Sequence, residues 1–364
     1  MARLGDYVNI KTGKLDANAS SENGAYPFFT CSVIPLKIDT YSYDCECVLV
    51  AGNGDLNVKY YNGKFDAYQR TYIIESKDKT VLLVPYVYCF LDKYVETLRK
   101  QSIGGVIKYI KLGNLTDAPI PIYDIQKQKE IVSKLDHVDS LITARQEQLA
   151  KLDELVKSQF IEMFGDMESN PKGWRESTLW TECYYIKDGP HKSPPYIDDQ
   201  NGIPFISTRN IVNGDGIDWS TAKYISEADY LQCIKKCKPE KGDILYSKGG
   251  TTGIAKYVDT DKRFANWVHV AVLKFGDQLD GRFLERMLNM DYCYRQSQQL
   301  TKGIANRDFV LSAIAQVKIF VPPIELQRQY VRFVEQSDKS KLAIQESLAE
   351  LETLKKALMQ KYFG

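Results

Sequence analysis

The sequence predicts an α+β protein in which two β-rich mixed domains are each followed by a long α-helix, the two helices pairing as an antiparallel coiled coil. A helical segment at residues 128–165 recurs at residues 327–364, with roughly a third of its positions identical and no gap. A looser repeat of short segments rich in Val, Ile, Tyr and Phe precedes each copy. Such an internal duplication, with one helix in each copy, can close as a pseudo-two-fold dimer.

The first of the two domains is expected at residues 1–123. Asn-Gly pairs, which favour tight hairpin turns, separate its short apolar segments. The clearest predicted hairpin is residues 58–65, with Asn62-Gly63 as its turn. Val84–Gln101 has helical spacing, so the domain is predicted to be mixed rather than all-β.

A long central helix is predicted at residues 124–165, and a C-terminal helix at residues 323–364. Apolar residues recur every seven positions, no Pro or Gly interrupts them, and a glycine follows each copy as a C-terminal stop. This periodicity predicts a helix-on-helix seam that also serves partner docking. The seam residues are Leu135, Ile142, Leu149, Leu152, Val156, Val334, Ile344, Leu348, Leu351 and Leu358.

A polar linker at residues 166–173 separates the two halves, and the second domain is expected at residues 174–322. Its strand-like segments match segments of the first domain, and in both copies a short apolar strand runs into a Gly-rich turn. The matched segments are 241–250 with 44–54, and 264–273 with 65–74.

Composition excludes several classes of protein. The net charge of +1, from 48 Lys and Arg against 47 Asp and Glu, argues against a role that depends on bulk basic charge, such as coating chromatin. No apolar run approaches the roughly 18 residues that span a membrane, and the N-terminus lacks a signal-peptide core, so a cytoplasmic protein is expected. The 8 cysteines lack metal-ligand spacing, which predicts free structural thiols and no metal site.

The sequence offers no catalytic residues that form a known constellation. It has 3 histidines and no His-Glu-x-x-His motif, phosphate-binding loop or nucleophile elbow. Ser193-Pro194-Pro195-Tyr196 is similar to the signature of amino-group DNA methyltransferases, which grips a flipped base. Such enzymes also need a Gly-rich S-adenosylmethionine loop after a strand, and no segment nearby supplies one.

Polar and basic residues gather in loops that follow matched strands of the two domains. Arg and Lys suit the major-groove edge of guanine, and Asn and Gln suit that of adenine. The loops differ most between the two copies, as expected if each copy reads a different short DNA sequence. The predicted DNA-binding residues are Thr30, Ser32, Asn53, Gln69, Arg70, Lys192, Thr208, Arg209, Asn210, Lys248, Thr251, Thr252, Arg263 and Asn266.

The order of these parts resembles the DNA-specificity subunit of Type I restriction-modification systems over the whole chain. One motif resembles a sequence common at the start of that family's second half: Phe164-Gly165-Asp166 followed by Asn170-Pro171-Lys172-Gly173-Trp174. Three further motifs that resemble the family occur in the expected order: 202–206 (GIPFI), 242–245 (GDIL) and 321–328 (VPPIELQR).

The resemblance implies a subunit that has no catalytic site. Each domain would be a target-recognition domain that reads one half of a split double-stranded DNA sequence. The helices would set the spacer between the two half-sites and dock two methyltransferase (modification) subunits, with restriction subunits joining the larger complex. S-adenosylmethionine, Mg and ATP would bind those partners and not this chain, and no membrane would be involved.

Two alternatives stay open from the residues alone. One is a self-contained amino-group DNA methyltransferase that uses Ser193-Pro194-Pro195-Tyr196, which tight binding of S-adenosylmethionine by the isolated chain would favour. The other is a coiled-coil scaffold whose domains bind protein rather than DNA.

Overall fold

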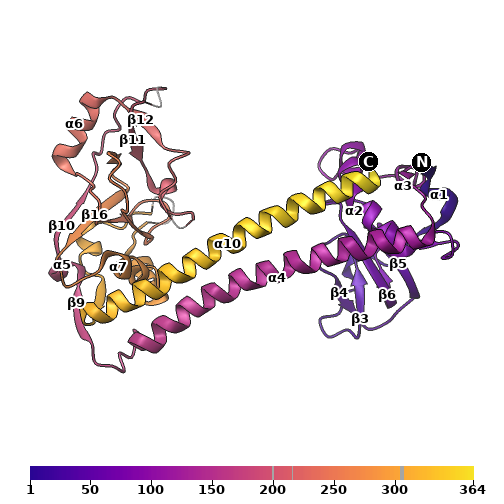
Figure 1. Cartoon of the computed structure of the whole chain (residues 1–364), viewed down its shortest axis with the longest axis horizontal. Helices are drawn as coiled ribbons and strands as arrows, with labels where there is room; N and C mark the ends of the chain where they lie inside the picture. The colour runs from indigo at the N-terminus through magenta and orange to yellow at the C-terminus, as the bar shows by residue number, and fades with distance from the viewer. Residues whose placement is uncertain (199–200, 215, 304–306) are drawn as a thin grey trace. The chain divides into compact units, whose positions relative to one another are not determined.

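The computed structural model describes residues 1–198, 201–214, 216–303 and 307–364. The chain divides into two compact units. The first unit is Met1–Leu149 together with Leu342–Gly364, and the second unit is Ala150–Lys341. Each unit therefore holds one domain and parts of both long helices, α4 (Ile125–Phe164) and α10 (Ile324–Phe363) (Figure 1).

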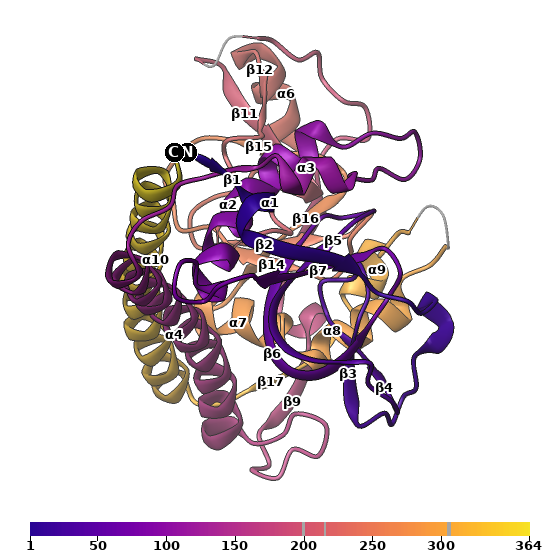
Figure 2. The same cartoon turned by 90° about the vertical axis from the view of Figure 1, so that its right-hand side faces the viewer.

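The first unit is built on a six-stranded sheet with the strand order β2-β7-β5-β6-β3-β4. Strand β6 pairs antiparallel with β5 along most of its length and then, at Asp66 and Ala67, parallel with β3. The strand curves strongly on its way from one partner to the other (Figure 2). The strands are β2 (Val8–Thr12), β3 (Tyr26–Phe29), β4 (Leu36–Ile38), β5 (Tyr43–Ala51), β6 (Val58–Ala67) and β7 (Thr71–Ser76).

The predicted hairpin at residues 58–65 is wrong, because these residues lie within one continuous strand. Asn62 and Gly63 pair with Glu46 and Cys45 of β5 in unbroken register. Gly63 has a φ of +139°, a conformation that residues with a side chain rarely adopt. The Asn-Gly pair therefore permits a bend inside a strand and not a turn between two strands.

Helix α2 (Val84–Gln101) packs on the sheet of the first unit. Its buried face includes Tyr86, Phe90 and Leu98, which share a core cluster with Val48 and Ile74 of the sheet. The Pro at its first turn suits a helix start, where the missing N–H needs no partner. The remaining short elements are β1 (Ala2–Arg3), α1 (Leu4–Tyr7), η1 (Ala17–Ala19), α3 (Leu112–Thr116) and β8 (Pro119–Ile120), with β1 pairing antiparallel to β8.

The second unit repeats this plan with its sheet split in two. A four-stranded sheet has the order β10-β16-β13-β14, and a three-stranded sheet has the order β12-β11-β15. Strands β17 and β9 pair antiparallel, as β8 and β1 do in the first unit. The strands are β9 (Arg175–Thr178), β10 (Cys183–Asp188), β11 (Ile203–Ile206), β12 (Lys223–Ile225), β13 (Ile244–Ser247), β14 (Ala255–Tyr257), β15 (Ala265–Asn266), β16 (Val270–Phe275) and β17 (Lys318–Val321).

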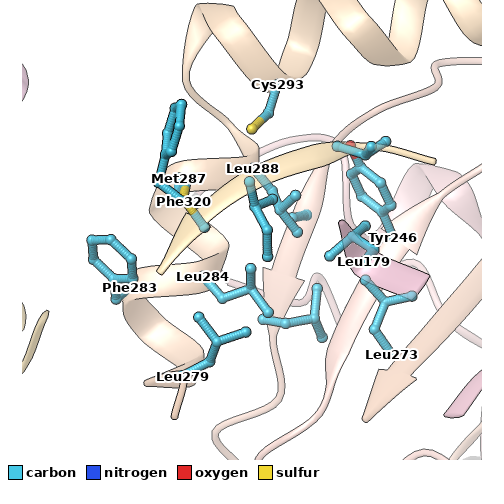
Figure 3. Packing of buried hydrophobic residues seen from close by; sticks show 14 of the residues in the cluster. Leu179, Tyr246, Leu273, Leu279, Phe283, Leu284, Met287, Leu288, Cys293 and Phe320 are labelled. Carbon is cyan, nitrogen blue, oxygen red and sulfur yellow. The ribbon is translucent and has the colours of Figure 1, made fainter. Parts of the chain in front are cut away.

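Short helices close the core of the second unit. Phe283 and Leu284 of α7 and Cys293 of α8 are fully buried, and they pack with Tyr246 and Leu273 of the sheet (Figure 3). Asp280 caps α7 by accepting hydrogen bonds from two backbone N–H groups of its first turn. The helices are α5 (Leu179–Glu182), η2 (Thr208–Asn210), α6 (Glu227–Lys236), α7 (Gly281–Leu288), α8 (Asp291–Leu300) and α9 (Leu311–Ile314).

One buried glutamine fastens each long helix to its own domain. In the first unit, the Gln128 amide donates to Val81 O (2.8 Å) and Tyr123 O (2.8 Å) and accepts from Leu83 N (2.9 Å). Gln327 makes the same set of three bonds in the second unit, with Gln278 O (2.9 Å), Pro322 O (2.7 Å) and Asp280 N (2.9 Å). Both side chains are completely buried, so all their polar atoms depend on these partners.

The two long helices lie antiparallel within each unit (Figures 1 and 2). In the first unit, Ile131 and Leu135 near the start of α4 pack with Met359 and Phe363 near the end of α10. In the second unit the end of α4 packs with the start of α10, including Phe160 with Tyr330. Ion pairs join the helices at Lys355–Asp139 (2.7 Å) in the first unit and Lys341–Asp153 (2.6 Å) in the second.

Burial along the predicted seam varies with distance from the domains. Leu135, Val156 and Val334 are buried, because each belongs to the core of its unit. The other predicted seam residues are only partly buried, since helix packs there against helix and solvent. These residues are Ile142, Leu149, Leu152, Ile344, Leu348, Leu351 and Leu358.

Residues 166–173 form hydrogen-bonded turns at the end of α4. The Asp166 carboxylate accepts from the backbone N–H groups of Glu168 (3.0 Å) and Ser169 (2.9 Å). The Trp174 indole N–H donates to Phe164 O (2.8 Å), and Trp174 N donates to the Asn170 side chain (2.9 Å). These bonds hold the start of the second domain against the end of α4. The residues that make them belong to the motif that resembles the start of the family's second half.

All 8 cysteines are free thiols, and six of them are buried. Burial raises the pKa of Cys89 and Cys183 to about 12, which makes both unreactive near neutral pH. Within the described parts of the chain, no helix is both long and apolar enough to cross a membrane.

Candidate nucleic-acid interface

Three loops meet at one end of the sheet in the second unit. They are 248–250 after β13, 267–269 between β15 and β16, and the described ends of a hairpin at 302–308. Backbone hydrogen bonds tie the three together, so the loops form one framework and not independent segments. The bonds run from Lys248 N to His269 O (2.9 Å), from Gly250 N to Arg307 O (3.4 Å), from Phe309 N to Lys248 O (2.7 Å), and in both directions between Lys302 and Asp308 (3.0 and 2.9 Å).

The first unit builds the same arrangement from a different sequence. Its three loops are 52–54 after β5, 68–70 between β6 and β7, and a hairpin at 103–109. We call this arrangement of three loops the loop frame of each unit. The corresponding bonds run from Gly52 N to Arg70 O (2.8 Å), from Gly54 N to Lys108 O (2.9 Å), from Ile110 N to Gly52 O (2.9 Å), and in both directions between Ile103 and Tyr109 (3.0 and 2.9 Å).

A glycine directly after β2 in the first unit, and one directly after β10 in the second, lets the backbone pass close to a neighbouring strand behind each frame. A Cβ at Gly13 would lie 2.1 Å from Ala67 O, and one at Gly189 would lie 1.8 Å from Asn266 O. Real Cβ atoms do not approach a carbonyl oxygen this closely, so only glycine fits. The two frames are therefore equivalent in backbone as well as in order along the chain.

The frame of the second unit contains a buried charge network. Lys248 is almost completely buried, with its ammonium 3.3 Å from Asp188 and 3.4 Å from Asp308. Asp188 also pairs with Lys236 at 2.7 Å. Burial, and then the Lys248 charge, lower the pKa of His269 below the ordinary imidazole value. Lys248 thus joins the end of β10 to the hairpin by charge, an interaction that Gly52, which has no side chain, cannot make in the first unit.

Several predicted DNA-binding residues lie on or beside the loop frames with exposed side chains. In the first unit, Gln69 and Arg70 are exposed on the 68–70 loop, and Asn53 is half-buried on the 52–54 loop. In the second unit, Thr251 follows the 248–250 loop, and the half-buried Thr208 donates a hydrogen bond to Gly249 O (3.0 Å). Three more predicted residues are exposed: Ser32 and Lys192 in loops, and Arg209 in η2, where its guanidinium donates to Thr221 O (2.8 Å).

Other predicted residues are buried, and the structure gives them a supporting position instead of an exposed one. Asn266 donates to Val270 O (2.7 Å), and the Asn210 oxygen accepts from Ser207 N (2.8 Å). These bonds hold the turns from which neighbouring side chains project. The buried members of the predicted set are Thr30, Asn210, Lys248, Thr252 and Asn266.

Arg263 is not brought to the loop frame. Its guanidinium forms an ion pair with Glu227 of α6 and lies over the Tyr230 ring at 4.6 Å. The pattern of residue types could not show this, because the partner helix is distant in sequence.

The sequence analysis did not predict the hairpins that complete the two loop frames. They bring exposed Lys108 and Tyr109 to the first frame, and exposed Lys302 and Arg307 to the second. A signal for them exists: a glycine with positive φ, Gly104 or Gly303, opens each hairpin shortly before the strand that leads into the long helix. Aligning the segments ahead of the two helices reveals this correspondence.

The Ser193-Pro194-Pro195-Tyr196 segment lies in a loop that precedes β11. The Tyr196 ring is half exposed, with its centroid 6.2 Å from that of Phe205 and 5.9 Å from the Lys223 ammonium. In the described residues, no group of three or more His, Cys, Asp or Glu side chains is placed to hold a metal ion.

Comparison with known proteins identifies the family. A family model described as the Type I restriction modification DNA specificity domain matches residues 1–154 and 185–354. The chain belongs to this family. The two matched regions correspond to the two copies of the domain, each with most of its long helix.

Named relatives and solved structures agree with this assignment. The chain is 25% identical over 397 residues to the type I restriction enzyme EcoDI specificity subunit of Escherichia coli, covering 99% of this chain and 86% of that one. It is 22% identical to the MjaVIII specificity subunit of Methanocaldococcus jannaschii, covering 99% and 90%. The crystal structure of the S subunit of a type I restriction-modification system from M. genitalium superimposes with a TM-score of 0.64, at 18% identity and 100% and 95% coverage. A chain from a structural study of the assembly and conformational transition of the type I R-M system gives a TM-score of 0.61 at 20% identity, covering 100% of this chain and 96% of that one.

The comparisons confirm the predicted family and fold class: two mixed α+β domains, a long helix after each, and an internal duplication. A specificity subunit of this family is a non-catalytic, DNA-recognising component of its restriction-modification system. The alternative of a self-contained methyltransferase is therefore not favoured.

Proposed function

We propose that each unit reads one half of a bipartite target in double-stranded DNA through its loop frame. The observation that carries this proposal is the repetition of one backbone framework with different exposed side chains. The first unit exposes Gln69, Arg70 and Lys108, whereas the second unit has the buried Val268, the half-buried His269 and the exposed Arg307 at the same positions. Two domains that recognise different half-sites can share one backbone framework, but they need different side chains on it.

The long helices supply the second part of the proposal. Each of α4 and α10 contributes residues to both units as one continuous element. We expect their length to set the number of unspecified base pairs between the half-sites, at 1.5 Å of rise per residue.

The partners and cofactors follow from the same proposal. Two methyltransferase subunits dock on the helices and domains, and restriction subunits join the complete complex. S-adenosylmethionine, Mg and ATP bind to those partners. The net charge of +1 agrees with a subunit that leaves much of the phosphate neutralisation to its partners.

A pair of single substitutions tests the assignment of one frame to one half-site. In the complex with methyltransferase subunits, Arg70→Ala should relax base preference in one half-site, and Arg209→Ala in the other. Lys238→Ala is a matched control, because this exposed lysine pairs with Glu240 away from the frame. A uniform loss of affinity for all DNA sequences would indicate phosphate contacts instead, and loss of both half-sites from either variant would refute separate reading.

A further inference from the structure

The hairpin of the first loop frame ends in an exposed apolar tip. Val106 is fully exposed (103%) and Ile107 is 62% exposed, and the flanking Ile103 and Tyr109 are also partly open to solvent. Soluble proteins tolerate single exposed apolar residues, but four within seven positions form a patch that calls for a partner.

The backbone holds this tip in one place. Ile103 and Tyr109 bond to each other in both directions, and Gly54 and Ile110 tie the base of the hairpin to the 52–54 loop. A Cβ at Gly104 would lie 2.4 Å from Ile107 O, so glycine is needed for the chain to turn this tightly. The Tyr72 hydroxyl donates to Ile110 O (3.2 Å) and braces the base further.

A second apolar tip stands on a loop bonded to the same frame. Val33 is 61% exposed and Ile34 is 74% exposed, between β3 and β4. The loop is joined to the frame by Cys31, whose thiol donates to Arg70 O (3.6 Å) and whose carbonyl accepts from the Asn57 amide (2.9 Å). Both apolar tips are therefore joined through the loop frame, which also carries the exposed Arg70.

At the paired positions of the hairpin, the second unit has polar residues where the first has apolar ones. Lys302 and Asp308 replace Ile103 and Tyr109 at the paired positions of the hairpin. In place of the Val33–Ile34 tip, β11 of the second unit is followed by η2, whose exposed side chain is Arg209. The contrast concerns the described residues on either side of the second hairpin's tip.

One group on DNA matches such an apolar tip among basic side chains. The C5-methyl of thymine is the apolar feature of base edges in the major groove, and that groove admits a two-stranded ribbon. Lys108, which follows Ile107 in the chain, and the exposed Arg70 can contact phosphates while the tip reaches the bases.

We propose that the Val106–Ile107 tip, supported by Val33 and Ile34, recognises thymine methyl groups in the half-site read by the first unit. This inference rests on the proposed function, and it adds the chemistry of one half-site.

Deoxyuridine substitution provides the test, because it removes the methyl group and keeps every hydrogen-bonding atom. Each thymine of the target is replaced in turn, and the affinity of the complex with methyltransferase subunits is measured. At one or more thymines of the first unit's half-site, the loss should be about fourfold, the transfer value of one buried methyl.

Val106→Ala should weaken binding to the natural target and abolish the response to deoxyuridine at the same position. Val81→Ala is the matched control, because this valine is 40% exposed in the same unit but lies outside the loop frame. It should leave the response unchanged.

Three results would overturn the inference while leaving bipartite reading intact: a first half-site without an A·T pair, no deoxyuridine effect at any of its thymines, or a Val106→Ala variant that binds methyltransferase subunits poorly but DNA normally. The last result would assign the tip to a protein partner. A complex that shows no sequence preference at all would instead refute the proposed function itself.

Discussion

Replacing either glycine behind the loop frames should damage one unit and spare the other. In Gly13→Ala, the new Cβ would lie 2.1 Å from Ala67 O and 2.4 Å from Tyr68 O. In Gly189→Ala it would lie 1.8 Å from Asn266 O. These neighbours are backbone atoms, so a side-chain rotation cannot relieve the overlap.

The cost can be worked out from the contacts. Ordinary contact begins at 3.4 Å, so the chain must move by about 1.3 Å at Gly13 and about 1.6 Å at Gly189. Overpacking of this kind costs about 1–3 kcal/mol. In the first unit the movement also strains two backbone bonds, from Gly13 N to Thr71 O (3.0 Å) and from Lys14 N to Ala67 O (3.1 Å). An unsatisfied buried backbone group adds about 1–3 kcal/mol, so the expected total is about 2–6 kcal/mol.

Hydrogen exchange measured by mass spectrometry is the suitable assay, because a chain with two units does not unfold as one two-state system. Gly13→Ala should speed exchange in β2, β3, β6 and β7 only, and relax one half-site only. Gly189→Ala should have the equivalent effect in the second unit. Gly113→Ala and Gly276→Ala are controls, because a Cβ there meets nothing closer than 3.8 Å. Equal damage to both half-sites by either frame variant would refute the reasoning, as would frame variants that behave like the controls.

Further perturbations address the charge network and the helices. Lys248→Met should destabilise the second unit by about 3 kcal/mol, at the low end for a broken buried pair because Asp188 keeps Lys236; unchanged exchange in the 302–308 hairpin would contradict this. The lowered pKa of His269 means that the unfolded chain binds a proton more readily, so the second unit should lose stability as the pH falls below 6.5, and His269→Gln should remove that part of the loss. A pH response equal in His269→Gln and the parent chain would show that other groups account for it. Inserting four residues in α4 adds about 6 Å of helix, so the spacer should lengthen by one or two base pairs with both half-sites unchanged; an altered half-site with the old spacer would disprove a spacing role.

Sequence patterns predicted the architecture well, because both long helices show the same seven-residue recurrence of apolar residues. Helix α4 occupies Ile125–Phe164 and α10 occupies Ile324–Phe363, where the seven-residue repeat places them. The matched segments 65–74 and 264–273 also occupy equivalent strands and turns. Core and seam positions are determined by which residues avoid water, and that information is local in the sequence.

The same patterns predicted the loops less well, because loop geometry depends on contacts between distant segments. Lys248 looks like a free basic residue after a strand, yet it is buried between Asp188 and Asp308. The Asn62-Gly63 pair has the composition of a turn, but the long partner strand β5 keeps it in register. The sequence analysis did not predict Lys108 and Arg307, because the bonds that join their hairpins to the frame come from loops distant in sequence.

The most direct test of the central claim is to map methylation of a genomic DNA library at single-base resolution, with this chain co-expressed with its methyltransferase subunit. If two loop frames read two half-sites, the methylated sites will share a split motif, two short specified blocks around a spacer of fixed length. One continuous block, or a spacer that varies from site to site, would contradict the account.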